Sequence, residues 1–134
     1  MKIVFTNGCF DIIHRGHLEM LNHSKNLGDL LIVGIDTDDR VRKNKGSGRP
    51  INNQEDRKYL LQSLRCVDKV ELFSTDAELE NLVKFYAPDI MVVGDDYEDK
   101  KVIGSEYADK LEFFRRIDGY STTSYIKKGS SLRR

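Results

Sequence analysis

Two histidines stand three residues apart in the most distinctive stretch of this chain. His14 and His17 follow a short apolar run and precede a segment with helical spacing of leucines, and Gly16 lies between them. Side chains three residues apart at the start of a helix share one face, and the backbone N–H groups there attract anions. Two imidazoles beside such a helix start form a site for phosphate, where charge develops during phosphoryl or nucleotidyl transfer.

The same spacing is open to two other interpretations. The histidines could serve only as capping and packing residues at the helix start. They could also form a metal pair, but no third ligand stands at a metal-site spacing and no CxxC or HExxH pattern occurs. We therefore expect no protein-bound metal, and spacing alone leaves capping and phosphate chemistry both open.

A run of cations without acidic residues follows the second expected strand. It contains Arg40, Arg42, Lys43, Lys45 and Arg49. Gly46 and Gly48 interrupt it, and we find no helical periodicity, so we predict a loop from Arg40 to Asn53. Within it, Arg40–Pro50 is expected to be mobile and to close its cations over phosphates when substrates bind. The alternative is an ordinary solvated loop.

Two further segments at expected strand ends carry polar residues. Gly94 permits a sharp turn, and Asp95 is suited to a sugar hydroxyl or a metal-bound phosphate, although an Asp-rich turn is the simpler explanation. Arg116 precedes Ser121 and Thr122, which would cap a last helix in any case. Hydroxyls at a helix start beside an arginine would also form a second anion site.

The elements that position these residues alternate along the chain. Strands are expected at Lys2–Thr6, Leu30–Ile35, Val67–Phe73, Asp89–Gly94 and Leu111–Arg115, and helices at Leu18–Leu27, Gln54–Leu64 with Asn53 as N-cap, Asp76–Tyr86 and Ser121–Lys128. Continuous apolar strands separated by helices indicate an α/β protein with a doubly wound, five-stranded parallel sheet of Rossmann-like type. Ligands of such sheets bind outside the carboxyl ends of the strands.

Length and composition narrow the class of protein. The 134 residues suffice for one domain, and 22 basic and 22 acidic side chains give no net charge. That balance argues against a nucleic-acid partner, and the short apolar runs argue against a membrane partner. The polar N-terminus is not expected to be a signal peptide, and two cysteines fit reduced thiols in a cytoplasmic protein. Neither a GxxxxGK[ST] loop nor a GxGxxG fingerprint occurs.

At this point the motifs resemble a known family. Asn7-Gly8-Cys9-Phe10-Asp11 followed by His14-Arg15-Gly16-His17 is similar to the HxGH signature of the cytidylyltransferase-like nucleotidyltransferases, and the resemblance runs from Phe5 to Lys128. Lys45–Pro50, Glu55–Arg57 and Arg65–Asp68 look like the adenylyltransferases that activate heptose 1-phosphate. Gly119–Ser124 matches the STT motif of the superfamily. The resemblance implies one nucleotidyltransferase domain over residues 1–128, and we expect residues 129–134 to be a disordered tail.

The resemblance also implies a reaction and a set of site residues. A sugar or polyol phosphate oxygen attacks the α-phosphate of a nucleoside triphosphate, pyrophosphate leaves, and Mg²⁺ travels on the phosphates without a covalent enzyme intermediate. The implied catalytic residues are His14, His17, Lys45 and Arg116. Nucleotide contacts are implied for Asn7, Gly8, Cys9, Phe10, Asp11, Gly16, Gly94, Asp95, Ser121 and Thr122, and acceptor contacts for Asp36, Lys45 and Arg57. The resemblance further implies that Asp11 orients the motif loop and that Arg57 supports either the lid or the acceptor phosphate.

One motif departs from the heptose enzymes and keeps alternatives open. Gly94-Asp95-Asp96-Tyr97 stands where those enzymes usually read GGDY, and its order is more like that of glycerol-3-phosphate cytidylyltransferase. The base, the acceptor and the oligomeric state stay open, with a homodimer expected. A non-catalytic nucleotide-binding module would be expected to lack motif residues, all of which are present. A fragment of a class I aminoacyl-tRNA synthetase would need a basic surface or an RNA-binding appendage.

Overall fold

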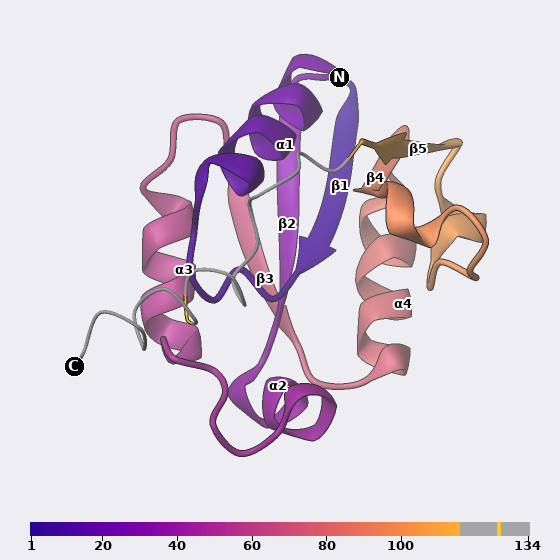
Figure 1. The fold of residues 1–134 in the computed structure, drawn as a ribbon. Helices are drawn as coiled ribbons and strands as arrows, with labels where there is room; N and C mark the ends of the chain where they lie inside the picture. The colour runs from indigo at the N-terminus through magenta and orange to yellow at the C-terminus, as the bar shows by residue number, and fades with distance from the viewer. Residues whose placement is uncertain (116–125, 127–134) are drawn as a thin grey trace.

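Five parallel strands form one sheet at the centre of the protein. The computed structural model describes residues 1–115 and 126. The sheet contains β1 (Ile3–Gly8), β2 (Leu30–Asp36), β3 (Lys69–Phe73), β4 (Ile90–Gly94) and β5 (Lys110–Phe114), in the order β3-β2-β1-β4-β5 (Figure 1). All four strand pairs are parallel. The predicted doubly wound parallel sheet is therefore confirmed, with strand ends within two residues of the predicted ones.

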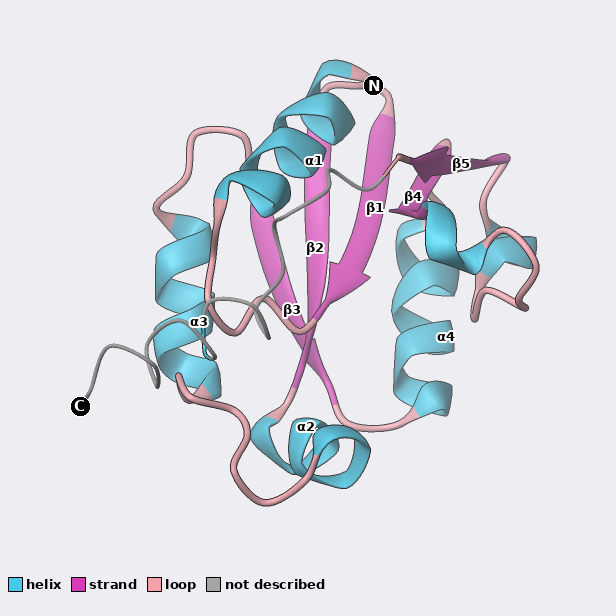
Figure 2. Cartoon of the chain, in the orientation of Figure 1, coloured by secondary structure: helices cyan, strands magenta, loops and turns pink. Residues whose placement is uncertain are grey.

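Helices cover both faces of this sheet. α1 (Arg15–Asn26) and α3 (Gln54–Gln62) lie on one face, and α4 (Asp76–Tyr86) lies on the other (Figure 2). Two separate apolar clusters result, one containing Leu21 and Leu61 and the other containing Leu79 and Val83. Neighbouring residues of each central strand enter opposite clusters, as Val4 and Phe5 do in β1. This two-sided burial explains why the strands read as continuous apolar runs.

The chain reverses its direction across the sheet between β1 and β4. From β1 it winds outward through β2 to β3, then returns over the other face to β4 and β5. Adjacent crossovers on opposite faces leave a crevice at the carboxyl ends of β1 and β4, where open α/β sheets bind ligands. The fold thus brings the segments after β1, β2 and β4 to one edge.

The region expected as a loop after β2 begins with a helix, so that prediction was wrong. α2 spans Asp38–Lys45, and its one buried residue, Val41, is 1% exposed. Thr37 caps the helix by accepting a hydrogen bond from the backbone N–H of Arg40, and Gly46 ends it with a φ of 99°. Acidic residues in the first turn and basic residues in the last turn complement the helix dipole.

The other helices differ from expectation mainly at their ends. α1 begins at Arg15, three residues before the predicted start at Leu18, because His14 is its N-cap. Asn53 caps α3 as predicted. The expected helix Ser121–Lys128 and the tail 129–134 lie outside the described residues, apart from residue 126. Within the described part of the chain, no helix has the length and apolar character that a membrane crossing requires.

Candidate active site

The two histidines build the start of α1. The Nδ1 atom of His14 accepts a hydrogen bond from the backbone N–H of Gly16 at 3.1 Å. The Nδ1 atom of His17 accepts from the backbone N–H of His14, also at 3.1 Å. The two imidazole rings stack with their centroids 3.9 Å apart. Two backbone donors that a helix start would leave without partners are thus satisfied by imidazole nitrogens.

These hydrogen bonds fix the tautomer of both rings. A backbone N–H can only donate, so each Nδ1 must be an unprotonated acceptor. In a neutral imidazole the proton then resides on Nε2. Capping therefore leaves each histidine with an Nε2–H donor. The two interpretations of the sequence are compatible, because Nδ1 caps the helix while Nε2–H is available to a phosphate.

Burial keeps both imidazoles neutral. Desolvation lowers the pKa of His14 below its usual value. The pKa of His17 falls to about 4, chiefly through desolvation, with further contributions from the neighbouring His14 and from the charge of Lys45. At neutral pH both side chains are uncharged hydrogen-bond donors beside a helix N-terminus. Such donors can stabilise negative charge on phosphate oxygens without first giving up a proton.

A pocket of about 380 Å³ opens at the carboxyl edge of the sheet. Strands β1, β2 and β4, helix α2 and the segment after β4 all contribute to it. Its lining consists of Asn7, Gly8, Cys9, Asp36, Arg40, Asn44, Lys45, Leu79, Val93, Gly94, Tyr97, Lys101, Val102 and Ile103. Six residues to which the resemblance gives a site role meet here, namely Asn7, Gly8, Cys9, Asp36, Lys45 and Gly94, whereas His14, Gly16 and His17 are not among the lining residues. Asp95 starts a short 3-10 turn, η1 (Asp95–Tyr97), and is not among the lining residues.

Sequence reasoning overlooked several lining residues. Asn44 was missed because α2 was not predicted, although Thr37 followed by Asp38 and Asp39 is a recognisable helix start. Lys101 was missed because it lies on irregular backbone seven residues after β4. Its ammonium adds a second lysine to a wall of the pocket.

Most cations of the run after β2 are held by carboxylates. Arg40 donates to Asp36 at 3.0 Å and to Asp76 at 2.8 Å, and Arg49 contacts Asp11 at 3.3 Å. The segment Arg40–Pro50 is thus a helix followed by a turn tethered through Arg49, and its expected closure over phosphates stays a prediction. Lys45 is exposed, and it differs from the arginines because no ion pair among the described residues includes it.

Two residues expected to contact nucleotide have buried side chains. The carboxylate of Asp11 is fully buried and accepts from the backbone N–H groups of Ile51 and Asn52, both at 2.8 Å. Phe10 is 4% exposed, and its ring lies beside that of His17. Neither side chain is available to a nucleotide. Asp11 instead anchors the loop before α1 to the segment before α3.

Arg57, expected to contact the acceptor, is also buried. Its side chain has no exposed surface, and its guanidinium hydrogen-bonds to groups of the protein. In this structure the guanidinium therefore has no exposed surface for a contact with substrate. The remaining site residues expected from the sequence, Arg116, Ser121 and Thr122, lie outside the described residues.

The amino-acid sequence matches a known family. The chain matches the cytidylyltransferase-like family over residues 5–128. It belongs to the cytidylyltransferase-like family. The expected family is thereby confirmed, and the histidine pair lies within the matched residues of this cytidylyltransferase-like protein.

Two curated relatives are similar over nearly all of this cytidylyltransferase-like chain. It is 50% identical over 127 residues to the bifunctional protein HldE of Aliarcobacter butzleri (strain RM4018). This alignment covers 95% of the chain and 26% of that relative. It is 48% identical over 127 residues to the bifunctional protein HldE of Helicobacter pylori (strain HPAG1), covering 95% and 27%. The chain therefore spans about a quarter of the length of these relatives.

A solved structure shares the cytidylyltransferase-like fold. The lipopolysaccharide core biosynthesis protein from Thermoplasma volcanium GSS1 aligns with a TM-score of 0.70 and 30% sequence identity. The alignment covers 88% of this chain and 99% of that one. The whole of that protein thus corresponds to the single sheet and its helices described above.

Acid should destabilise this cytidylyltransferase-like protein through His17. Its folded pKa of about 4 lies below the ordinary 6.5, so the unfolded chain binds more protons between these values, and stability is lost as pH falls from 6.5 towards 4. The loss at pH 5 is expected to be on the order of 1–2 kcal/mol. Urea unfolding between pH 4.5 and 7.5 measures it. His17→Gln can keep the capping hydrogen bond and should flatten the acid limb, whereas an equally steep limb in both proteins would contradict this assignment.

Cys9 is expected to be dispensable for turnover. Burial raises the pKa of its thiol, an effect that outweighs the lowering by the Lys45 and Arg57 charges, so the nucleophilic thiolate is scarce at neutral pH. Cys9→Ser should keep turnover within about threefold of the parent, because direct displacement needs no enzyme nucleophile. Turnover and circular dichroism measured together test this. A folded but inactive Cys9→Ser protein would point to covalent catalysis.

Proposed function

We propose that this nucleotidyltransferase joins ATP to heptose 1-phosphate, forming ADP-heptose and pyrophosphate. The observation that carries the proposal is the pair of neutral Nε2–H donors at the start of α1, close enough to Lys45 for its charge to lower the pKa of His17. The choice of adenine and heptose is supported by the similarity to HldE proteins over 95% of the chain and by the Lys45–Pro50 and Arg65–Asp68 motifs.

In the proposed reaction, a phosphate oxygen of the acceptor attacks the α-phosphorus of ATP from the side opposite the leaving group. The acceptor–phosphorus bond forms as the bond between the α-phosphorus and the bridging oxygen breaks. His14 and His17 donate hydrogen bonds to the α- and β-phosphates, whose charge increases in the transition state. Lys45, at the end of α2, holds phosphates of both substrates together.

The pocket supports binding of a polyhydroxylated acceptor. Asn7, Asp36 and Asn44 bring amide and carboxylate groups suited to sugar hydroxyls, and Lys45 and Lys101 bring charges suited to the phosphate. Burial raises the pKa of Asp36, while its ion pair with Arg40 opposes that rise. In this proposal the β- and γ-phosphates are bound by Arg116, Ser121 and Thr122.

In the proposed reaction, Mg²⁺ is bound to the phosphates of the nucleoside triphosphate. Among residues 1–115 and 126, no three His, Cys, Asp or Glu side chains are grouped to hold a metal ion. A Mg²⁺ ion bound mainly by phosphate oxygens and water needs few protein ligands, and it would neutralise charge on the departing pyrophosphate.

A second candidate is transfer of CMP to glycerol 3-phosphate. The Gly94-Asp95-Asp96-Tyr97 order favours it, and Gly94 and Tyr97 both line the pocket. A glycerol acceptor would fill less of the pocket volume than a seven-carbon sugar.

A substrate panel distinguishes these candidates. The protein is incubated with Mg²⁺, each of the four common nucleoside triphosphates and either heptose 1-phosphate or glycerol 3-phosphate, and pyrophosphate release is followed. The proposal expects the fastest release with ATP and heptose 1-phosphate. Fastest release with CTP and glycerol 3-phosphate would favour the alternative, and ATP binding without release in any combination would indicate a non-catalytic module. Light scattering of the same sample tests the expected homodimer.

A further inference from the structure

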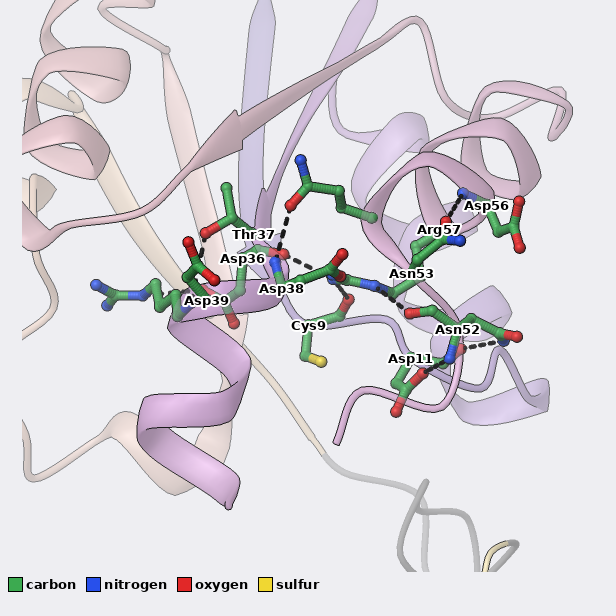
Figure 3. A network of polar contacts seen from close by, with 12 residues as sticks. Cys9, Asp11, Asp36, Thr37, Asp38, Asp39, Asn52, Asn53, Asp56 and Arg57 are labelled. Carbon is green, nitrogen blue, oxygen red and sulfur yellow. Dashed lines mark hydrogen bonds and ion pairs between the residues drawn. The ribbon is translucent and has the colours of Figure 1, made fainter. Parts of the chain in front are cut away.

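Arg57 is a fully buried arginine whose hydrogen bonds all lead towards the active-site edge of the sheet. Its Nε donates to the carbonyl oxygen of Asn52 at 2.9 Å. Its Nη1 donates to the carbonyl oxygens of Cys9 at 3.0 Å and Asp36 at 2.7 Å. Its Nη2 donates to Asp38 Oδ1 at 2.8 Å. Figure 3 shows these groups converging on the guanidinium from separate segments.

Each acceptor belongs to a segment that carries part of the site. Cys9 and Asp36 line the pocket. Asp38 is the first residue of α2, which ends at Lys45. Asn52 also holds Asp11 through its backbone N–H at 2.8 Å and its side-chain amide at 2.7 Å. The guanidinium thus connects the loop that leads into the histidine pair with the helix that carries the lysine.

Stability alone gives a weak reason for an arginine here. A buried ion pair such as Arg57 with Asp38 costs desolvation free energy, and apolar residues of similar volume often stabilise a fold as well or better. The planar guanidinium offers five N–H donors in a rigid fork, which an apolar side chain or a lysine cannot reproduce. Four acceptors from four segments make use of that geometry.

We propose that Arg57 is a positioning residue for nucleotidyl transfer, which sets the Lys45 helix at a fixed distance from the histidine loop. The proposal rests on the proposed nucleotidyl transfer, in which Lys45 and the histidines act on the same phosphates. Arg57 itself touches no substrate. Its effect on turnover passes through the position of Lys45.

The length of α2 magnifies a disturbance at its start. Asp38 and Lys45 are separated by seven residues, or about 10 Å along a helix. A tilt of about 6° at Asp38 would displace the end of the helix by about 1 Å, and a misplacement of that size can lower a rate about a hundredfold. Arg57→Lys keeps the positive charge but replaces the fork with one ammonium, so it should release α2 from at least part of this network.

A double-mutant cycle between Arg57→Lys and Lys45→Ala tests the proposal. With the NTP and acceptor that give the fastest turnover of the parent, Arg57→Lys should lower kcat at least tenfold and change the KM for the nucleotide less than about threefold. In the Lys45→Ala background the same substitution should lower kcat less than about threefold further, because the group it misplaces is already absent. Equal fold-losses in both backgrounds would overturn the proposal.

Leu61→Val and Asp38→Ala supply the control and the fallback. Leu61 lies on the same helix as Arg57, is fully buried and is not among the residues that line the pocket, so Leu61→Val should lower stability and leave kcat within about twofold. If Arg57→Lys does not fold, Asp38→Ala removes only the link to α2 and should show the same non-additivity with Lys45→Ala. Additive losses for that pair would overturn the proposal.

Amide hydrogen exchange separates this proposal from the proposed function. If the parent protein turns over no substrate, the proposed function fails, and exchange still tests the coupling. Arg57→Lys should then lose protection in both residues 9–14 and residues 38–45, whereas Leu61→Val should not. Loss in neither segment, or equal losses in the two variants, would overturn the positioning role.

Discussion

Replacing His17 with alanine is expected to lower kcat by on the order of a hundredfold or more, with a much smaller loss of nucleotide affinity. The substitution removes a neutral Nε2–H donor that we propose acts on charge developing on the phosphates, and such donors matter most in the transition state. His14→Ala should have an effect of similar size. Steady-state kinetics with titration of the nucleotide by calorimetry separates turnover from binding.

A second substitution separates catalysis from capping at His14. His14→Asn retains a side chain favoured at helix N-caps but has no imidazole Nε2–H. It should recover the stability that His14→Ala loses, while kcat stays low. Near-normal turnover of any of these three variants would show that the histidine concerned does not act on the phosphates. Recovery of turnover by His14→Asn would mean that His14 acts only as the N-cap of α1.

Lys45→Ala is expected to lower kcat by on the order of a hundredfold with little change in the free energy of unfolding. Lys45 lines the pocket, is exposed, and forms no ion pair with the described residues. Its removal therefore costs the folded protein little, but it removes the cation proposed to hold both substrates' phosphates. Turnover and urea unfolding of the same sample measure the two quantities.

Lys43 provides a matched control for this prediction. It is an exposed lysine of the same helix, two residues away, and it is not among the lining residues of the pocket. Lys43→Ala should leave kcat within about twofold and lower it far less than Lys45→Ala does. Equal losses for the two lysines would mean that only the net charge of α2 matters.

The sheet could be predicted from the sequence because its central strands are continuous apolar runs. β2 and β4 are nearly continuous runs of buried aliphatic residues, and only a sheet covered on both faces buries such runs. α2 could not be found by periodicity, since Val41 is its single buried residue. Its signals are a Thr37 cap and a dipole-matched order of charges, which are weaker than an apolar stripe.

The chemistry of the site was only partly readable from residue types. The sequence presented capping and phosphate binding as alternatives for His14 and His17, and the hydrogen bonds at Nδ1 show that capping leaves Nε2–H as the donor. For Asp11 and Arg57, the family resemblance implied substrate contacts as well as supporting roles. Their burial depends on tertiary contacts with Ile51, Asn52 and Cys9, which residue spacing does not reveal.

Phosphorus NMR with an isotope-labelled acceptor shows directly which oxygen attacks the α-phosphate. Heptose 1-phosphate carrying ¹⁸O on its non-bridging phosphate oxygens is incubated with ATP, Mg²⁺ and the protein. Direct attack by the acceptor on the α-phosphate predicts ADP-heptose with ¹⁸O in the bridge between its two phosphorus atoms and on the sugar-linked phosphorus, together with unlabelled pyrophosphate. Label in the pyrophosphate, an unlabelled bridge, or no ADP-heptose from a folded, ATP-binding protein would rule out direct transfer of AMP to heptose 1-phosphate.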